Sequence, residues 1–136
     1  MARVSEIRSA LESWLVTQTN IPANISPYIE DTTDFPSLNV GNHRARRTTA
    51  YMGDSQSIKT YFLSVRAYVW SDDDSIAESE RVCYLLERAI EEFESAHRAL
   101  EIYSAQTNEV HTDEGLFAPY GVIDLNLTIT YQEEYT

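Results

Sequence analysis

Apolar and polar residues alternate most regularly in two stretches of the chain. Residues 58–70 read IKTYFLSVRAYVW and residues 121–131 read GVIDLNLTITY. Because successive side chains of a strand lie on opposite faces, both stretches are predicted to be strands with one face in the core. In the first, the predicted core face is Tyr61, Leu63, Val65, Ala67 and Val69; the other face, expected to meet another layer or another subunit, is Thr60, Phe62, Ser64, Arg66, Tyr68 and Trp70. In the second, the predicted core face is Ile123, Leu125, Leu127, Ile129 and Tyr131.

Two other stretches have apolar residues at three- and four-residue steps, which predicts amphipathic helices. The first helix is expected over residues 2–18, with an apolar stripe of Val4, Ile7, Leu11, Trp14 and Leu15. The second is expected over residues 75–97, with a stripe of Val82, Leu85, Leu86, Ala89, Ile90 and Phe93. Ser75 and Glu78 match the S-x-x-E pattern of a capping box at the start of this helix.

The remaining segments complete the predicted fold. Residues 37–41 are expected to form a strand that enters a basic segment, and Met52–Ser55 is a turn signal, so residues 37–70 are predicted to be a long antiparallel hairpin. A proline-containing loop precedes it, with a short strand as one alternative at residues 27–30. Leu100, Ile102 and Val110 are expected in short extended segments around a turn at residues 106–108, and residues 114–121 in a loop.

This order of elements predicts an α+β fold. Its mostly antiparallel sheet would contain the long β-hairpin, and the two amphipathic helices would pack on one face. The length of 136 residues suits a single domain, residues 1–136, with the hairpin around residues 37–70 projecting from it.

Charge is distributed unevenly along the chain, whose formal net charge is −12. Residues 43–66 contain five Lys or Arg residues and one Asp, a formal charge of +4, so the rest of the chain carries −16. An acidic chain is unsuited to bulk nucleic-acid binding, which requires phosphates to be neutralised. The asymmetry instead favours complementary surfaces, as in self-assembly or docking to a partner.

No pattern in the chain predicts catalysis or a cofactor. Asp72, Asp73 and Asp74 offer oxygen ligands for a divalent cation, but acids before a helix are better explained by capping and by the helix dipole. The single cysteine, Cys83, permits no disulfide within one chain, which favours a reducing compartment, and lies near the stripe of the second helix as a small apolar residue. The phosphate-loop, dinucleotide-binding and nucleophile-elbow motifs are absent from the sequence, as is a metal-binding histidine motif. No enzyme, metal or cofactor is therefore expected, nor any membrane span, because no run of about 18 apolar residues occurs.

The basic cluster of Arg44, Arg46 and Arg47 admits three interpretations. With Tyr51 available for stacking it resembles a small nucleic-acid patch, although three arginines are few and the chain is acidic. It is also consistent with a solvated hairpin. The third interpretation is an interface arm that meets acidic surface on a neighbouring copy or a partner. The candidate interface residues are Arg44, Arg46, Arg47, Tyr51, Arg66, Tyr68 and Trp70.

The arrangement as a whole resembles the tail terminator, or tail-completion, proteins of tailed bacteriophages. The resemblance lies in the N-terminal amphipathic helix, the hairpin that ends in TYFLSVRAYVW, the segment SDDDSIAESERVCYLLERAIEEF and the closing GLFAPYGVIDLNLTITY. It covers nearly the whole chain. Head-completion and stopper proteins of the phage neck share the size range, and they are the alternative; a small DNA-binding accessory protein is a more distant one.

The resemblance implies a structural virion protein without catalytic residues, assembled in the host cytoplasm. Members of the family form a hexameric ring that ends tail-tube growth and joins the tail to the head-side connector. The implied partners are other copies of the chain, the tail tube protein, a head-side neck or connector protein and, as a further candidate, the tail sheath. DNA would only pass through the ring, and an acidic lumen would repel it.

Overall fold

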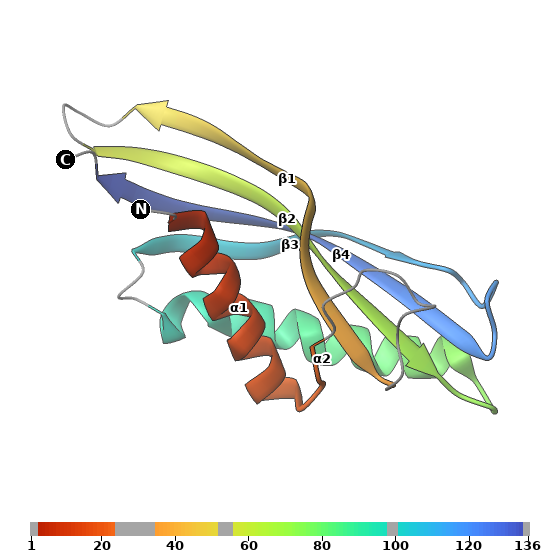
Figure 1. The fold of residues 1–136 in the computed structure, drawn as a ribbon. Helices are drawn as coiled ribbons and strands as arrows, with labels where there is room; N and C mark the ends of the chain where they lie inside the picture. Colours follow the sequence, from red (N-terminus) through yellow and green to blue (C-terminus); the bar gives the residue numbers. More distant parts are fainter. Residues whose placement is uncertain (1–2, 24–34, 52–55, 98–100, 135–136) are drawn as a thin grey trace.

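The computed structural model (Figure 1) describes residues 3–23, 35–51, 56–97 and 101–134, with the backbone alone for residues 3–4, 42–51, 56–57 and 133–134. Within these ranges lie the helices α1 (Arg3–Thr19) and α2 (Ser75–Ala96) and the strands β1 (Ser37–Tyr51), β2 (Gln56–Trp70), β3 (Ile102–Thr112) and β4 (Tyr120–Glu134). The strands form one sheet in the order β1-β2-β4-β3, and each neighbouring pair is antiparallel. The predicted α+β fold with a mostly antiparallel sheet is confirmed.

Strand β2 is paired with β4 along its whole length and with β1 along most of it. It pairs with β4 from Gln56↔Glu134 to Trp70↔Tyr120, and with β1 from Tyr51↔Ser57 to Ser37↔Tyr68. The predicted long hairpin is therefore present, and the basic segment lies on its outer strand. The register of β1 shifts between Gly41 and Arg46, so Arg44 lies in the irregular part of the pairing.

Both helices pack on the same face of the sheet (Figure 1), where one cluster of buried side chains joins helices and strands. The predicted core faces of β2 and β4 are buried throughout: no member is more than 2 % exposed. From α1 the cluster takes Ile7, Leu11 and Leu15, and from α2 it takes Val82, Leu86, Ala89, Ile90 and Phe93. The period-2 patterns thus identified the core faces of β2 and β4 correctly. Of the predicted helix stripes, Trp14 and Leu85 are only half-buried, and the side chain of Val4 lies outside the described residues.

A hydrogen bond and a ring contact join the two helices. The indole Nε1 of Trp14 in α1 donates a hydrogen bond to the backbone carbonyl of Ala89 in α2, at 2.7 Å. The ring of Trp14 also meets His97 edge-on, with ring centroids 5.2 Å apart. His97 is the residue that caps the C-terminus of α2, so this contact holds the end of α2 against α1.

Two local predictions were wrong. The N-cap of α2 is Asp74 rather than Ser75: the Asp74 carboxylate accepts a hydrogen bond from the Ala77 amide at 3.0 Å, and Ser75 is the first helical residue. Both residue types cap helices well, and the sequence pattern did not separate them.

The turn predicted at residues 106–108 is also absent. These residues lie within the single strand β3, whose register with β4 shifts between Thr107 and Glu109. The predictions for residues 27–30, residues 52–55 and Leu100 lie outside the described residues.

Candidate assembly surface

The basic arm, residues 43–51 of β1, lies on an outer strand of the sheet. Its backbone pairs with the first half of β2, since Arg46 is opposite Phe62 and Arg47 is opposite Tyr61. Tyr51 is the last residue of β1 and is opposite Ser57. Arg46 and Arg47 therefore begin the half of the hairpin that lies farther from the start of α2, and Arg44 precedes them in the irregular part of the pairing. Figure 1 shows this half extending away from the start of α2.

The other candidate interface residues of β2 differ in what surrounds them. The guanidinium of Arg66 makes two hydrogen bonds to the carboxylate of Asp124, its neighbour on β4, each at 2.9 Å. This bonding raises the pKa of Arg66 above its ordinary value, although burial opposes the shift. Tyr68 is only 2 % exposed, whereas Trp70 is 43 % exposed. Within one chain, Trp70 is thus the member of this group most available to a partner.

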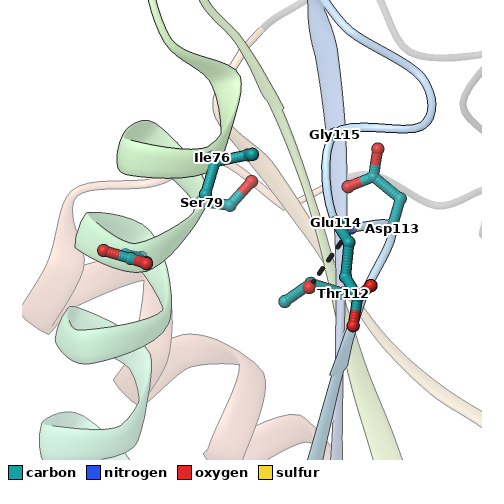
Figure 2. A pocket seen from close by; sticks show the side chains of 7 residues that line it. Ile76, Ser79, Thr112, Asp113, Glu114 and Gly115 are labelled. Atoms are coloured by element: carbon teal, nitrogen blue, oxygen red, sulfur yellow. Dashed lines mark hydrogen bonds between the residues drawn. The ribbon is translucent and has the colours of Figure 1, made fainter.

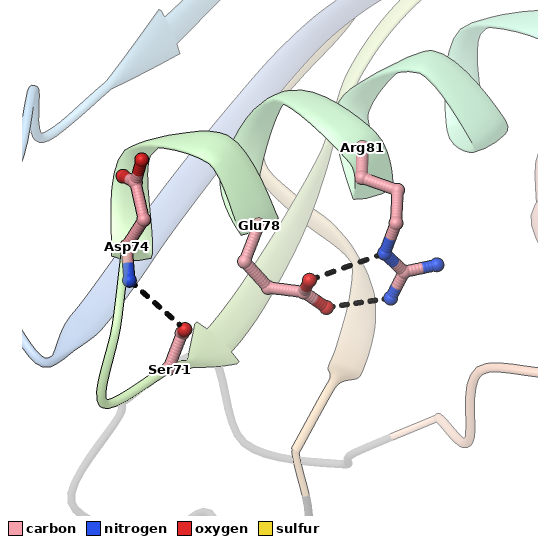
Figure 3. Close-up of polar contacts among 4 residues, drawn as sticks. All are labelled: Ser71, Asp74, Glu78 and Arg81. Carbon is pink, nitrogen blue, oxygen red and sulfur yellow. Dashed lines mark hydrogen bonds and ion pairs between the residues drawn. The ribbon is translucent and has the colours of Figure 1, made fainter.

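At the far end of β2, the chain turns into α2 through Ser71-Asp72-Asp73-Asp74, and all three aspartates are exposed. Ser71 accepts a hydrogen bond from the Asp74 amide at 3.2 Å, which shapes the turn (Figure 3). One turn into the helix, Glu78 pairs with Arg81 through contacts of 2.5 and 3.1 Å, and this hydrogen bonding lowers the pKa of Glu78. Capping and helix-dipole effects account for Asp74. Asp72 and Asp73 remain exposed acids that have no ion pair with a described residue.

The segment between β3 and β4 is a well-bonded turn. The carboxylate of Asp113 accepts hydrogen bonds from the amides of Phe117, at 2.9 Å, and Val122, at 3.2 Å. Gly115 has φ +85°, a conformation that favours glycine, and a Cβ there would come within 3.1 Å of Ile76 in α2. The Ser71 amide also donates to the Pro119 carbonyl at 2.9 Å. The turn is therefore held against the start of α2.

These two segments form a continuous region that we call the acidic end: residues 70–76 and 113–120. They contain five Asp or Glu residues and no Lys, Arg or His. The region also presents large apolar side chains, whose exposed fractions are Leu116 79 %, Phe117 55 %, Ile76 49 %, Trp70 43 % and Tyr120 40 %. The segments that carry these side chains contact one another, since Trp70 pairs with Tyr120 and Gly115 lies beside Ile76. Several exposed apolar side chains on adjoining segments are typical of an interaction site, unlike single exposed residues.

The sequence analysis missed most of this region. It assigned residues 114–121 to a loop and placed Ile76 outside the apolar stripe of α2. The available signal was a pair of large apolar residues, Leu116 and Phe117, between Gly115 and Pro119. What the sequence could not show is that this loop packs beside the first turn of α2.

A cavity of about 270 Å³ adjoins the acidic end, between the first turns of α2 and the turn after β3 (Figure 2). It is lined by Ile76, Ser79, Glu80, Thr112, Asp113, Glu114 and Gly115. The Ser79 hydroxyl is buried and has no hydrogen-bond partner among the described residues. The lining combines acids with apolar surface.

The remaining candidates for chemistry have structural surroundings. Burial and, after it, a hydrogen bond from the Cys83 thiol to Glu87 at 3.1 Å raise the pKa of Cys83 to about 12. The thiol is therefore protonated at neutral pH, whereas the thiolate is the nucleophile. In the part of the chain that the structure describes, no three His, Cys, Asp or Glu residues gather as a metal site would require. Nor is any helix among the described residues long and apolar enough to cross a membrane.

A comparison with known protein families found a match. No curated protein matches the chain. The model of the family described as Bacteriophage Tail Tube Terminator Protein matches residues 4–136, nearly the whole chain. That extent includes both helices, all four strands, the basic arm and the acidic end. The chain therefore belongs to the bacteriophage tail tube terminator protein family, and it is a structural component of a phage tail.

Proposed function

We propose that the protein forms a hexameric ring that ends the tail tube and joins the tail to the head-side connector. The observation that carries this proposal is the family match over residues 4–136. Membership of a tail terminator family implies association with the tail tube and with other virion components. The ring and the junction with the connector are the further steps that we propose.

The fold supports a role in assembly. The sheet has two outer strands, β1 and β3, and outer strands present backbone groups that other chains can pair with or cover. The hairpin of β1 and β2 would project from a single domain and overlap a neighbouring copy. Identical contacts repeated from copy to copy form a ring when the rotation closes.

Charge supports a role around passing DNA. The net charge of −12 would repel phosphate from a lumen lined by acidic surface, so DNA would slide through without being held. The basic arm would then face protein rather than the lumen. The interface residues that we propose are Arg44, Arg46, Arg47, Tyr51 and Trp70. Arg66, which is bonded to Asp124, and the buried Tyr68 would act indirectly, by holding β2 in place.

Native mass spectrometry of the purified protein, alone and with its tail tube protein, tests the ring. Six copies of the 15.6 kDa chain have a mass of about 94 kDa. Growth of tube protein in the presence of the ring should stop at shorter lengths than growth without it. A chain that stays monomeric under both conditions would contradict the proposal.

A tube-end binding assay also distinguishes a terminator from a head-side stopper protein. A terminator binds purified tube ends in the absence of any connector protein, whereas a stopper binds the connector and leaves tube ends uncovered.

A further inference from the structure

The basic arm and the acidic end carry opposite charges. Residues 43–51 contain three arginines and no acid, while residues 70–76 and 113–120 contain five acids and no base. The acidic end also exposes apolar side chains from the end of β2, the start of α2, the turn after β3 and the start of β4. One surface therefore offers both charge complementarity and apolar area to a basic partner, the combination that gives specificity together with affinity.

The basic arm and the acidic end are separated along the sheet. Arg46 pairs with Phe62 in the middle of β2, and Trp70 ends the same strand eight residues later. At a rise of about 3.3 Å per residue this separates them by roughly 26 Å. Figure 1 shows the β1–β2 hairpin extending away from the start of α2. Because β2 is paired with β4 over this whole length and with β1 as far as Tyr68, the sheet cannot fold back, and the arm cannot reach the acidic end of its own chain.

We propose that the basic arm of one copy docks on the acidic end of the next copy. The proposal rests on the ring proposed above and specifies which surfaces make it. Arg44, Arg46 and Arg47 would lie against Asp72, Asp73 and Glu114, and the hairpin would cover Ile76, Leu116 and Phe117. The contact joins two different surfaces of identical chains, so it is heterologous and repeats around a closed ring.

Two charge-reversal variants test this docking. In the arm variant, Arg44, Arg46 and Arg47 are replaced by Glu; in the end variant, Asp72, Asp73 and Glu114 are replaced by Lys. Asp74 and Asp113 are kept, because they cap α2 and hold the turn. Each variant alone should lose the ring, with at least a tenfold rise in the dissociation constant between copies. Circular dichroism and thermal unfolding check that each monomer is folded.

Mixing the two variants gives the sharper test. In an equal mixture, the Glu residues of the arm variant face the Lys residues of the end variant. The native arm of the end variant faces the native acidic end of the arm variant. Rings with alternating copies should reappear. A variant that failed for lack of folding would not recover on mixing.

Matched controls separate docking from general charge effects. Glu91→Lys with Glu94→Lys reverses two exposed acids in the second half of α2, away from the acidic end, and should leave assembly unchanged. Replacing the three arginines by Lys keeps the charge and should also preserve the ring. Assembly of the native chain should weaken as salt rises, since the pairs lie at a surface.

The outcomes distinguish this inference from the proposed function. If the native chain forms rings and both reversal variants form them equally well, the docking is wrong and the ring stands. If the variants lose the ring but the mixture does not regain it, the arm and the end are not each other's partners. A native chain that never self-associates, with or without tube protein, overturns both proposals.

Discussion

Gly121 allows β4 to pass close to the first turns of α2, and its replacement by Ala tests that packing. A Cβ at this position would lie 2.4 Å from the Ser79 hydroxyl oxygen and 2.6 Å from Cγ2 of Val69. Both distances are shorter than any relaxed contact. Neighbouring atoms must move, and both neighbours are buried, with Ser79 4 % and Val69 0 % exposed.

The expected cost of Gly121→Ala follows from overpacking. Extra methyl groups in packed cores destabilise by about 1–3 kcal/mol, while replacing a glycine in a compatible conformation gains about 0.4–1 kcal/mol through the unfolded chain. The clash is larger, so we expect a net loss of about 1–2 kcal/mol. For a chain of this length that lowers Tm by roughly 3–8 °C. Thermal and urea unfolding followed by circular dichroism measure both quantities.

Ser79→Ala supplies the matched background. It removes the nearest clashing atom and also a buried hydroxyl that has no partner among the described residues, so alone it should be neutral or slightly stabilising. In this background Gly121→Ala should cost less, by about 1 kcal/mol, because only the Val69 contact remains. If Gly121→Ala is neutral, or costs the same with and without the Ser79 hydroxyl, the packing described here between β4 and α2 is incorrect.

Three further predictions concern single contacts. Asp74→Ala should destabilise the protein by about 1 kcal/mol through loss of the α2 N-cap, while Asp73→Ala should change stability by less than half of that; equal losses would mean that Asp74 is not the cap. A double-mutant cycle of Arg66→Ala and Asp124→Ala should give a coupling of about 1–2 kcal/mol at pH 7, because the pair is bidentate and only partly exposed; a coupling near zero would refute the pair. Folding raises the pKa of Cys83 from 9.0 to about 12, so the stability that its protonated thiol contributes should be complete below pH 9 and fall as the pH rises towards 12. Accordingly, iodoacetamide should label Cys83 at pH 8 far more slowly in the folded protein than in the protein unfolded in urea. Mass spectrometry measures both rates, and equal rates would contradict the raised pKa.

The sequence predicted the elements whose periodicity is strong. Strands β2 and β4 alternate through ten or more residues, and their core faces were identified residue by residue, as were most of the stripe residues of the helices. Strand β3 was broken into pieces because most of its residues are exposed, with Val110 at 38 %, and its register shifts leave no clean alternation.

The candidate surface was predicted only in part. The basic arm is visible in the sequence because its three arginines lie within four positions, and the hairpin around it follows from turn and strand signals. The acidic end depends on residues about 40 positions apart, such as Ile76 and Gly115, that meet only through the fold. No local pattern records that contact. Tyr68 shows the opposite difficulty. Its face of β2 was expected to meet another layer or another subunit, and Tyr68 was named as a candidate interface residue, whereas within its own chain it is only 2 % exposed.

The central claim is that this chain closes the end of a tail tube as a ring of copies joined arm to end. Cryo-electron microscopy of tube protein assembled in the presence of the native chain tests it most directly. The account predicts one six-fold ring at a single end of each tube, with the β1–β2 hairpin of each copy resting on residues 70–76 and 113–120 of its neighbour. Tubes whose ends carry no added density, or rings in which that surface of each copy faces solvent, would contradict it.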